Sequence, residues 1–200
     1  MGGHRLRGGA VVVTDPLPEE VAAELLARWR EPHRRYHGVS HLADGLEALE
    51  LLGAGDLERL AYWCHDAVHT NTSPQDELAS AEVARALLAP HLTPTEVDEV
   101  CRLVLITISH APTAGDQRAA RVADADLHGL GLTWERYLAN VQAIRAELPG
   151  LPPAQWRARR RAFAQRMLER PRIFATELGL ERWEGSARAN LERELAGESL

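Results

Sequence analysis

Residues 57–68, LERLAYWCHDAV, repeat apolar side chains at spacings of three and four residues. This period places Leu57, Leu60 and Cys64 on one face of a helix and predicts an α-helix that packs into a core. The same period recurs from about residue 21 to residue 197, whereas the alternation typical of β-strands is nearly absent. We therefore predict an all-α fold, a bundle of about eight to ten helices.

Length and composition indicate a globular protein with one core. The chain has 200 residues, of which 45% are hydrophobic and 26% are charged. We expect a single helical domain over residues 15–200 and a flexible tail over residues 1–14. No apolar run is long enough for a membrane span and the first residues do not resemble a secretory signal, so we expect a cytoplasmic protein. The net charge of -6 argues against nucleic acid as a partner.

The opening segment contains a polar pair among apolar residues. His65 and Asp66 stand side by side, between Cys64 and Ala67, where the pattern predicts burial. A buried carboxylate is costly unless it is paired or binds a cation. The pair therefore needs a partner from elsewhere in the fold.

Other histidines and aspartates interrupt apolar segments in the same way. His37 and His41 are four residues apart and would share a helical face, and His110 ends an apolar segment. Asp124 and Asp126 follow in another apolar segment. Imidazole and carboxylate together suit divalent transition metals, so the combination predicts a metal site.

A histidine, an adjacent His-Asp pair and a later aspartate on helices resemble the HD superfamily of metal-dependent phosphohydrolases. The correspondence is His41, His65 with Asp66, and an aspartate of VADADL (122–127). More narrowly, the chain is similar, from about residue 17 to residue 197, to a bacterial subgroup of predicted HD phosphohydrolases. The segments that carry this similarity are RYHGVSH (35–41), WCHDAVHT (63–70), DELASA (76–81), ITISH (106–110), DADLHGLG (124–131), IRAEL (144–148), Arg160, RPRIF (170–174) and ARANLEREL (187–195).

The resemblance implies an HD-domain helical bundle that binds a divalent metal ion, with Mn, Fe, Co, Ni, Mg and Zn all compatible. His41, His65 and Asp66 match metal ligands, and the closing carboxylate is Asp126 or Asp124. Leucines one and four positions after Asp126 are similar to the phosphodiesterase branch of the superfamily and favour Asp126. The implied activity is hydrolysis of a small phosphorylated metabolite such as a nucleotide.

The resemblance also suggests catalytic groups. By analogy with the phosphodiesterase branch, His37 protonates the leaving oxygen, and His110 is an alternative donor. Asp66 could align or deprotonate the attacking water. Several HD nucleotidases carry a glutamate three residues after the aspartate of the pair, but this chain has His69 there. Glu77 is a candidate replacement, and His69 would then contact phosphate or a second metal.

Arginines supply the expected phosphate contacts. All 23 basic residues are arginine, and seven of them lie between residues 157 and 172. A guanidinium group can bind phosphate with two hydrogen bonds, so we expect Arg35, Arg160 and Arg170 to steady phosphate oxygens. The alternative for each is an ordinary ion pair with a surface glutamate.

Two other functions are compatible with the pattern. Some HD-fold proteins are di-iron oxygenases with two extra histidines between the pair and the last aspartate, and His91 and His110 lie in that interval. The second alternative is a non-catalytic HD module that binds a nucleotide. No aromatic ladder or glycine-rich phosphate loop selects a particular substrate. A homodimer is compatible with the sequence.

Overall fold

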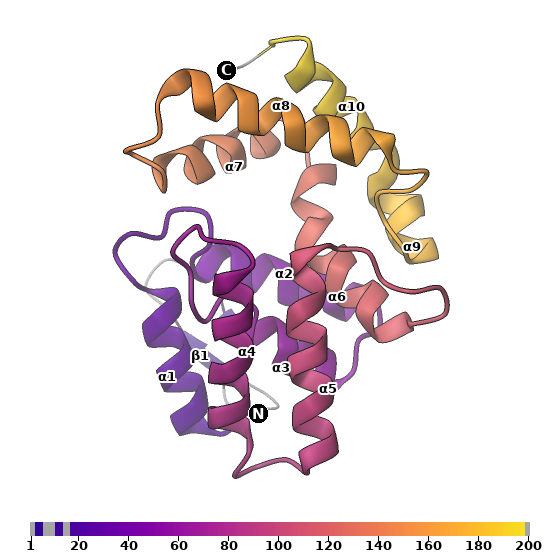
Figure 1. The fold of residues 1–200 in the computed structure, drawn as a ribbon. Helices are drawn as coiled ribbons and strands as arrows, with labels where there is room; N and C mark the ends of the chain where they lie inside the picture. Colours follow the sequence, from indigo (N-terminus) through magenta and orange to yellow (C-terminus); the bar gives the residue numbers. More distant parts are fainter. Residues whose placement is uncertain (1–2, 6–10, 14–16, 199–200) are drawn as a thin grey trace.

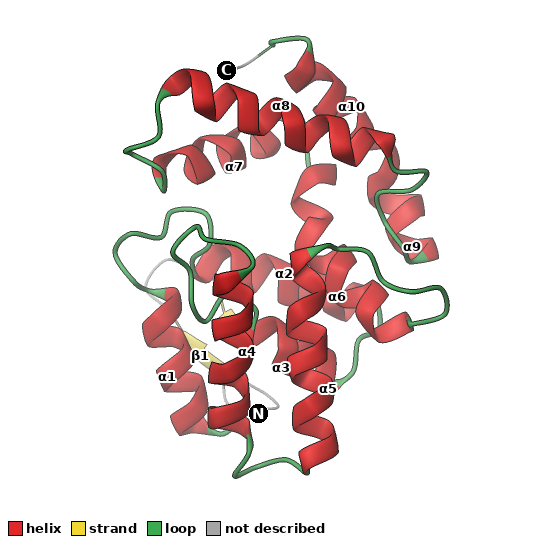
Figure 2. Ribbon diagram, viewed as in Figure 1, coloured by secondary structure: helices red, strands yellow, loops and turns green. Residues whose placement is uncertain are grey.

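The computed structural model describes residues 3–5, 11–13 and 17–198, and these are almost entirely helical (Figure 2). They form nine α-helices of 9 to 17 residues and one additional single turn, which confirms the predicted all-α bundle. The helices are α1 (Glu19–Trp29), α2 (Val39–Leu51), α3 (Asp56–Cys64), α4 (Gln75–Leu88), α5 (Pro94–Leu105), α6 (Gln117–Leu127), α7 (Trp134–Ala146), α8 (Pro153–Glu169), the turn α9 (Glu177–Gly179) and α10 (Gly185–Leu195).

Shorter elements connect or extend these helices. Two 3-10 turns, η1 (Ile106–Ile108) and η2 (His128–Gly131), follow α5 and α6, and a π-helical segment, η3 (Leu180–Glu184), leads into α10. Strands β1 (Gly3–Arg5) and β2 (Val11–Val13) pair antiparallel. The expected flexible tail over residues 1–14 otherwise falls outside the described residues.

The helices form two groups that face each other (Figure 1). Helices α1 to α6 make the larger group, in which α4 and α3 both pack against α5 and α2 packs against α3 and α6. Helices α7, α8 and α10 make the second group, and η2 contacts both α6 and α10. One buried hydrophobic cluster includes side chains from α1 through α10. Residues from both groups can therefore contribute to one site.

Helix ends follow local sequence rules. Thr93 caps α5: its hydroxyl accepts from the Glu96 amide, and the Glu96 carboxylate accepts from the Thr93 amide, with Pro94 following. This capping box satisfies amides that the first helical turn leaves without a partner. Gly53 follows α2 at a φ of 68°, a conformation in which glycine avoids the steric cost of a Cβ atom. These caps fix where the helices start and end.

Tryptophan and tyrosine side chains pack around His65. Trp29 and Trp63 are almost completely buried, and the Trp29 indole N–H donates to the Trp63 carbonyl at 2.9 Å. The Trp29 ring lies 5.4 Å from the His65 ring, and Tyr62 lies 4.3 Å from it on another side. Packing against these aromatic rings therefore fixes the orientation of the His65 ring.

We expect Gly45→Ala to destabilise the protein. An added Cβ would lie 1.9 Å from the hydroxyl oxygen of Tyr62, whose ring is completely buried. Alanine gains about 1 kcal/mol in helix propensity, but overpacking a core costs about 1–3 kcal/mol, so steric conflict prevails. Urea unfolding should show a net loss of up to about 2 kcal/mol.

Gly185→Ala is the matched control, because no atom of the described residues lies within 4 Å of its added Cβ, apart from its chain neighbours and the backbone of its own helix. That variant should be neutral or slightly more stable. Equal stability of the two variants would contradict the packing that places Tyr62 beneath α2.

Among the described residues, no helix combines the length and apolar character required to cross a membrane.

Candidate metal centre

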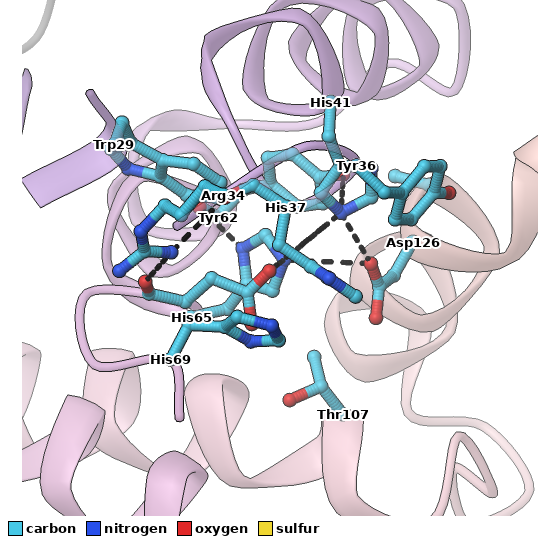
Figure 3. A network of polar contacts seen from close by, with 12 residues as sticks. Trp29, Arg34, Tyr36, His37, His41, Tyr62, His65, His69, Thr107 and Asp126 are labelled. Atoms are coloured by element: carbon cyan, nitrogen blue, oxygen red, sulfur yellow. Dashed lines mark hydrogen bonds and ion pairs between the residues drawn. The ribbon is translucent and has the colours of Figure 1, made fainter. Parts of the chain in front are cut away.

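Histidine and aspartate side chains from three helices meet at one point. His41 lies in the first turn of α2, His65 and Asp66 directly follow the last residue of α3, and Asp126 is near the end of α6. In Figure 3, His41 and Asp126 point toward one another from opposite elements. The separations are 3.1 Å from His41 Nε2 to Asp126 Oδ1, 3.3 Å from His41 Nε2 to His65 Nε2, 3.4 Å from His65 Nε2 to Asp126 Oδ1, and 3.2 Å from His65 Nε2 to Asp66 Oδ2.

These distances fit ligands of one ion. Nitrogen and oxygen ligands lie about 2.0–2.2 Å from a divalent metal, so two neighbouring ligands are about 3.0–3.5 Å apart. His41, His65 and Asp126 form a cluster that could hold a metal ion. Asp66 Oδ2 is buried, and although it lies 3.2 Å from His65 Nε2, no described residue hydrogen-bonds it. An unsatisfied buried carboxylate oxygen beside this cluster is suited to a cation.

The tautomer of His65 favours the same interpretation. Its Nδ1 donates to the Tyr62 carbonyl at 2.6 Å. A proton on Nδ1 leaves Nε2 with a lone pair, which is the form that binds a metal. His65 therefore presents an acceptor to Asp66 and Asp126 rather than a neutral donor, and a positive charge is needed between them.

The pKa values of His65 and Asp126 also favour a cation in the cluster. Burial alone would lower the pKa of His65, but Asp66 and Asp126 outweigh burial and hold that pKa well above its ordinary value. Burial would raise the pKa of Asp126, but His65, His110 and His41 hold it well below its usual range. The two carboxylates thus remain charged and favour a cation, either a proton on His65 or a divalent metal.

His110 orients Asp126 from the other side. Its Nε2 lies 2.6 Å from Asp126 Oδ2, the oxygen that faces away from His41. His110 has a φ of 48°, which is strained for a residue other than glycine. Arg170 holds this segment by donating to the carbonyls of His110 and Ser109 at 2.9 and 2.7 Å. These contacts do not support the phosphate contact expected of Arg170, because its guanidinium group holds the backbone at His110.

Asp124 has a different environment from Asp126. Its carboxylate accepts from the Ala175 amide at 2.7 Å, the Thr176 amide at 2.8 Å and the Thr176 hydroxyl at 2.6 Å. Burial raises its pKa although these hydrogen bonds oppose the shift. Asp124 thus anchors the segment before α9, and the structure assigns the position in the metal cluster to Asp126.

A second cluster comprises His37, His69 and Glu147, and it too could hold a metal ion. The Glu147 side chain is completely buried, and its Oε1 accepts from the amides of Arg35, Tyr36 and His37 at 2.6 to 2.9 Å. Its Oε2 lies 2.7 Å from His37 Nδ1 and 3.4 Å from His69 Nε2. The two imidazole rings stack at 4.0 Å between centroids.

Glu147 is the residue of this region that the sequence analysis missed. Although burial opposes it, the hydrogen bond from His37 and the nearby His69 imidazole hold the Glu147 pKa well below its usual range. A signal was available: Glu147 caps the C-terminus of α7, where the helix dipole disfavours an anion. Because its first oxygen already has three donors, we interpret Glu147 as the group that fixes the loop and orients His37.

Arg34, rather than its neighbour Arg35, supports the backbone at Asp66 and His37. The buried Arg34 guanidinium donates to the carbonyl of Asp66 at 2.8 Å and to that of His37 at 3.1 Å. Arg35 is exposed, and its Nη1 donates to the carbonyls of Pro32 and Arg34. The expectation that Arg35 contacts phosphate is not supported by these contacts.

Arg160 also has another partner. It is buried, and its guanidinium forms a bidentate ion pair with Glu194 at 2.8 and 2.7 Å and contacts the Tyr137 hydroxyl. This ion pair does not support the phosphate-binding role expected of Arg160, because the guanidinium nitrogens that would bind phosphate already bind Glu194. The pair joins α8 to α10 within the second group of helices.

We expect Arg160→Met to lower the free energy of unfolding by about 3–5 kcal/mol, because Glu194 would become an uncompensated buried charge. Chemical denaturation measures this loss, and the double variant Arg160→Met with Glu194→Leu should recover most of it. A single variant of unchanged stability with a raised KM would instead restore the phosphate-binding role.

A polar cavity of about 260 Å³ lies beside the cluster. His37, Asp66, His69, Glu77, Thr107, His110 and Asp126 are among its lining residues. Glu77 Oε2, like Asp66 Oδ2, is buried without a hydrogen-bond partner among the described residues. Glu77 therefore lines the same cavity as Asp66 and Asp126, and its water-positioning role stays a prediction.

His91 lies apart from these groups. It follows α4, and its Nε2 is 3.8 Å from Glu20 in α1, with both side chains partly exposed to solvent. The oxygenase alternative counted His91 and His110 as ligands, and of these only His110 contacts the cluster. His91 therefore does not supply the additional ligand that the oxygenase alternative requires.

No protein-family model, curated protein or solved structure matches this chain. The class of site is therefore defined by its geometry, as a buried histidine–aspartate cluster within an all-α fold.

Proposed function

We propose that the chain is a metal-dependent phosphohydrolase of the HD superfamily that hydrolyses a phosphoester of a nucleotide or a related small phosphorylated metabolite. The observation that carries the proposal is the convergence of His41, His65, Asp66 and Asp126 within ligand distances, beside a polar cavity. A divalent ion bound there would supply Lewis-acid activation of water and would screen charge on phosphorus.

Asp66 and Glu77 act on the attacking water. Each has a buried carboxylate oxygen without a hydrogen-bond partner among the described residues, and both line the polar cavity. A water molecule in this cavity can donate to either oxygen, which aligns it and accepts its proton. Asp66 lies beside the metal cluster and Glu77 on α4, so the two would hold the water from different directions.

His37 protonates the leaving oxygen. Its Nδ1 is held by Glu147, which leaves Nε2 as the ring nitrogen that can donate. A proton carried on Nε2 can then pass to the leaving oxygen. His37 also lines both cavities that adjoin Asp126. It would therefore lie beside a leaving group bound in either cavity.

The remaining polar groups position the reacting parts. His110 fixes Asp126 through its second oxygen. His69 lines the polar cavity, and its Nε2 is buried without a hydrogen-bond partner among the described residues. This nitrogen can donate to a phosphoryl oxygen, a contact that was expected of the arginines.

Metal analysis and a phosphate-release screen test the proposal. Protein purified without chelator should contain a divalent transition metal, and it should release phosphate from nucleotides when Mn²⁺, Co²⁺ or Ni²⁺ is added. Chelation should abolish release, and readdition of metal should restore it, equally with and without oxygen. Metal binding without release from any ester would favour a non-catalytic module, and oxygen-dependent turnover would favour an oxygenase.

A further inference from the structure

A second cavity also adjoins the histidine–aspartate cluster. It has a volume of about 220 Å³ and lies between η2, α7 and α8, with His37, His110 and Asp126 at one end. Apolar side chains form most of its wall: Leu127, Leu130, Val141, Ile144 and Phe163. We call this space the apolar lobe. The polar cavity and the apolar lobe share His37, His110 and Asp126, so both adjoin the cluster at Asp126.

Gly129 leaves open space in the wall of the apolar lobe, and Asn140 supplies a polar side chain there. A Cβ at Gly129 would lie 3.1 Å from the Tyr36 hydroxyl and 3.3 Å from Asn140 Nδ2, so glycine keeps this part of the wall open. The Asn140 side chain can both donate and accept hydrogen bonds. A cavity of about 150 Å³ lined by similar residues is large enough for benzene, so the lobe can hold a somewhat larger ring-containing group.

Both cavities are poor in available positive charge. The described residues that line the polar cavity include no arginine, whereas Asp66, Asp76, Glu77 and Asp126 all line it. Arg160, which lines the apolar lobe, is neutralised by its ion pair with Glu194. A chain of phosphates carries several negative charges and would meet carboxylates here without a compensating guanidinium group.

We infer that the substrate is a phosphomonoester with a compact, uncharged, ring-containing leaving group that binds in the apolar lobe. This inference rests on the proposed function and narrows it: the single phosphoryl group occupies the polar cavity next to the cluster, and the organic part extends past His37 into the lobe. Water gives one proton to Asp66 or Glu77 and attacks phosphorus, the bond from phosphorus to the ester oxygen breaks, and His37 gives its proton to that oxygen. Nucleoside triphosphates and other polyphosphates are excluded by charge.

Phosphate release measured with Mn²⁺ tests the inference through three esters. Phenyl phosphate has the expected leaving group, methyl phosphate lacks a ring, and ATP carries the excluded polyphosphate. We expect kcat/KM for phenyl phosphate to exceed that for ATP by at least about tenfold. Ile144→Trp, which narrows the lobe from α7, should lower kcat/KM for phenyl phosphate by at least about tenfold and leave that for methyl phosphate nearly unchanged.

Gln142→Trp is the matched control, because residue 142 is exposed on the same helix and does not line the lobe. It should behave like the parent toward all three esters. Turnover of ATP as efficient as that of phenyl phosphate, or an Ile144→Trp variant with parental kinetics, would overturn the inference while leaving the phosphohydrolase proposal intact.

If no ester is hydrolysed, the phosphohydrolase proposal fails, and the lobe is judged by binding alone. Benzylphosphonate, a non-hydrolysable isostere of phenyl phosphate, is titrated calorimetrically in Mn²⁺. Binding to the parent and to Gln142→Trp but not to Ile144→Trp would support the lobe as a binding site. Absence of binding, or equal binding to all three proteins, would overturn it.

Discussion

Asp126→Asn is expected to remove metal binding and phosphate release together. Asp126 Oδ1 lies 3.1 Å from His41 Nε2 and 3.4 Å from His65 Nε2, and its charge is needed to offset a divalent ion. Loss of a hydrogen-bond partner behind a metal ligand lowers affinity by about 10–100-fold, so loss of the ligand's charge should exceed about 100-fold. Metal content after dialysis and phosphate release in Mn²⁺ measure the two effects.

Thermal unfolding provides a readout that does not depend on activity. A metal at about 100 times its dissociation constant stabilises the native state by about 2.7 kcal/mol. The parent protein should therefore unfold at a higher temperature when Mn²⁺ is added, and Asp126→Asn should show no such rise.

Asp124→Asn is the control, two residues away on the same helix. It should retain metal, the Mn²⁺-dependent rise in unfolding temperature and most of the activity. Its free energy of unfolding should fall by about 1–3 kcal/mol, because an amide group would replace an oxygen that accepts from the amide and hydroxyl of Thr176. If Asp124→Asn lost the metal and Asp126→Asn kept it, the assignment of the ligand would be wrong.

The two aspartates show where sequence reasoning reaches its limit. Apolar periodicity predicted the helices, because burial of one face per helix is written in the spacing of side chains. Residues two apart on a helix project about 200° apart, so Asp124 and Asp126 necessarily face different neighbours. Which of them faces His41 depends on how α6 packs between α2 and the segment before α9, and that packing involves contacts distant in sequence.

The arginines illustrate the same limit. Arginine is a suitable residue type for binding phosphate, so this role was expected of Arg35, Arg160 and Arg170. Each guanidinium group has other partners, whose positions only the tertiary structure defines. Arg34 supports the backbone at Asp66 and is adjacent in sequence to Arg35. Nothing in the residue type distinguishes the buried arginine from its exposed neighbour, because both belong to a loop without helical periodicity.

Glu147→Gln should lower kcat by about 100-fold, the smaller end of the range for general acid–base catalysis, with a much smaller effect on metal affinity. The glutamine carbonyl can still accept from the amides of Arg35, Tyr36 and His37, so the loop remains supported. Its NH₂ group would face His37 Nδ1, where a proton is now held. Nδ1 would then have to accept rather than donate, so the carboxylate contact that orients the ring for proton transfer from Nε2 is lost.

Stability against pH gives an independent measurement. The pKa of Glu147 is held below its usual range, so this carboxylate stays ionised in the native protein at pH values where the unfolded chain binds a proton, below about 4.3. The stabilisation is therefore present above that pH and is lost as the pH falls. The free energy of unfolding of the parent should decrease more steeply from about pH 6 to pH 3 than that of Glu147→Gln.

The comparison isolates Glu147 because Asp66 and Asp126, whose pKa values are also lowered, are present in both proteins. Glu135→Gln, an exposed change on the same helix, controls for the loss of one negative charge and should match the parent in kcat and in pH dependence. Parental kcat in Glu147→Gln, together with a parental pH slope, would show that His37 does not depend on this carboxylate. A reduced slope with parental kcat would limit Glu147 to supporting the loop, and the leaving group would then have to take its proton from a group other than His37.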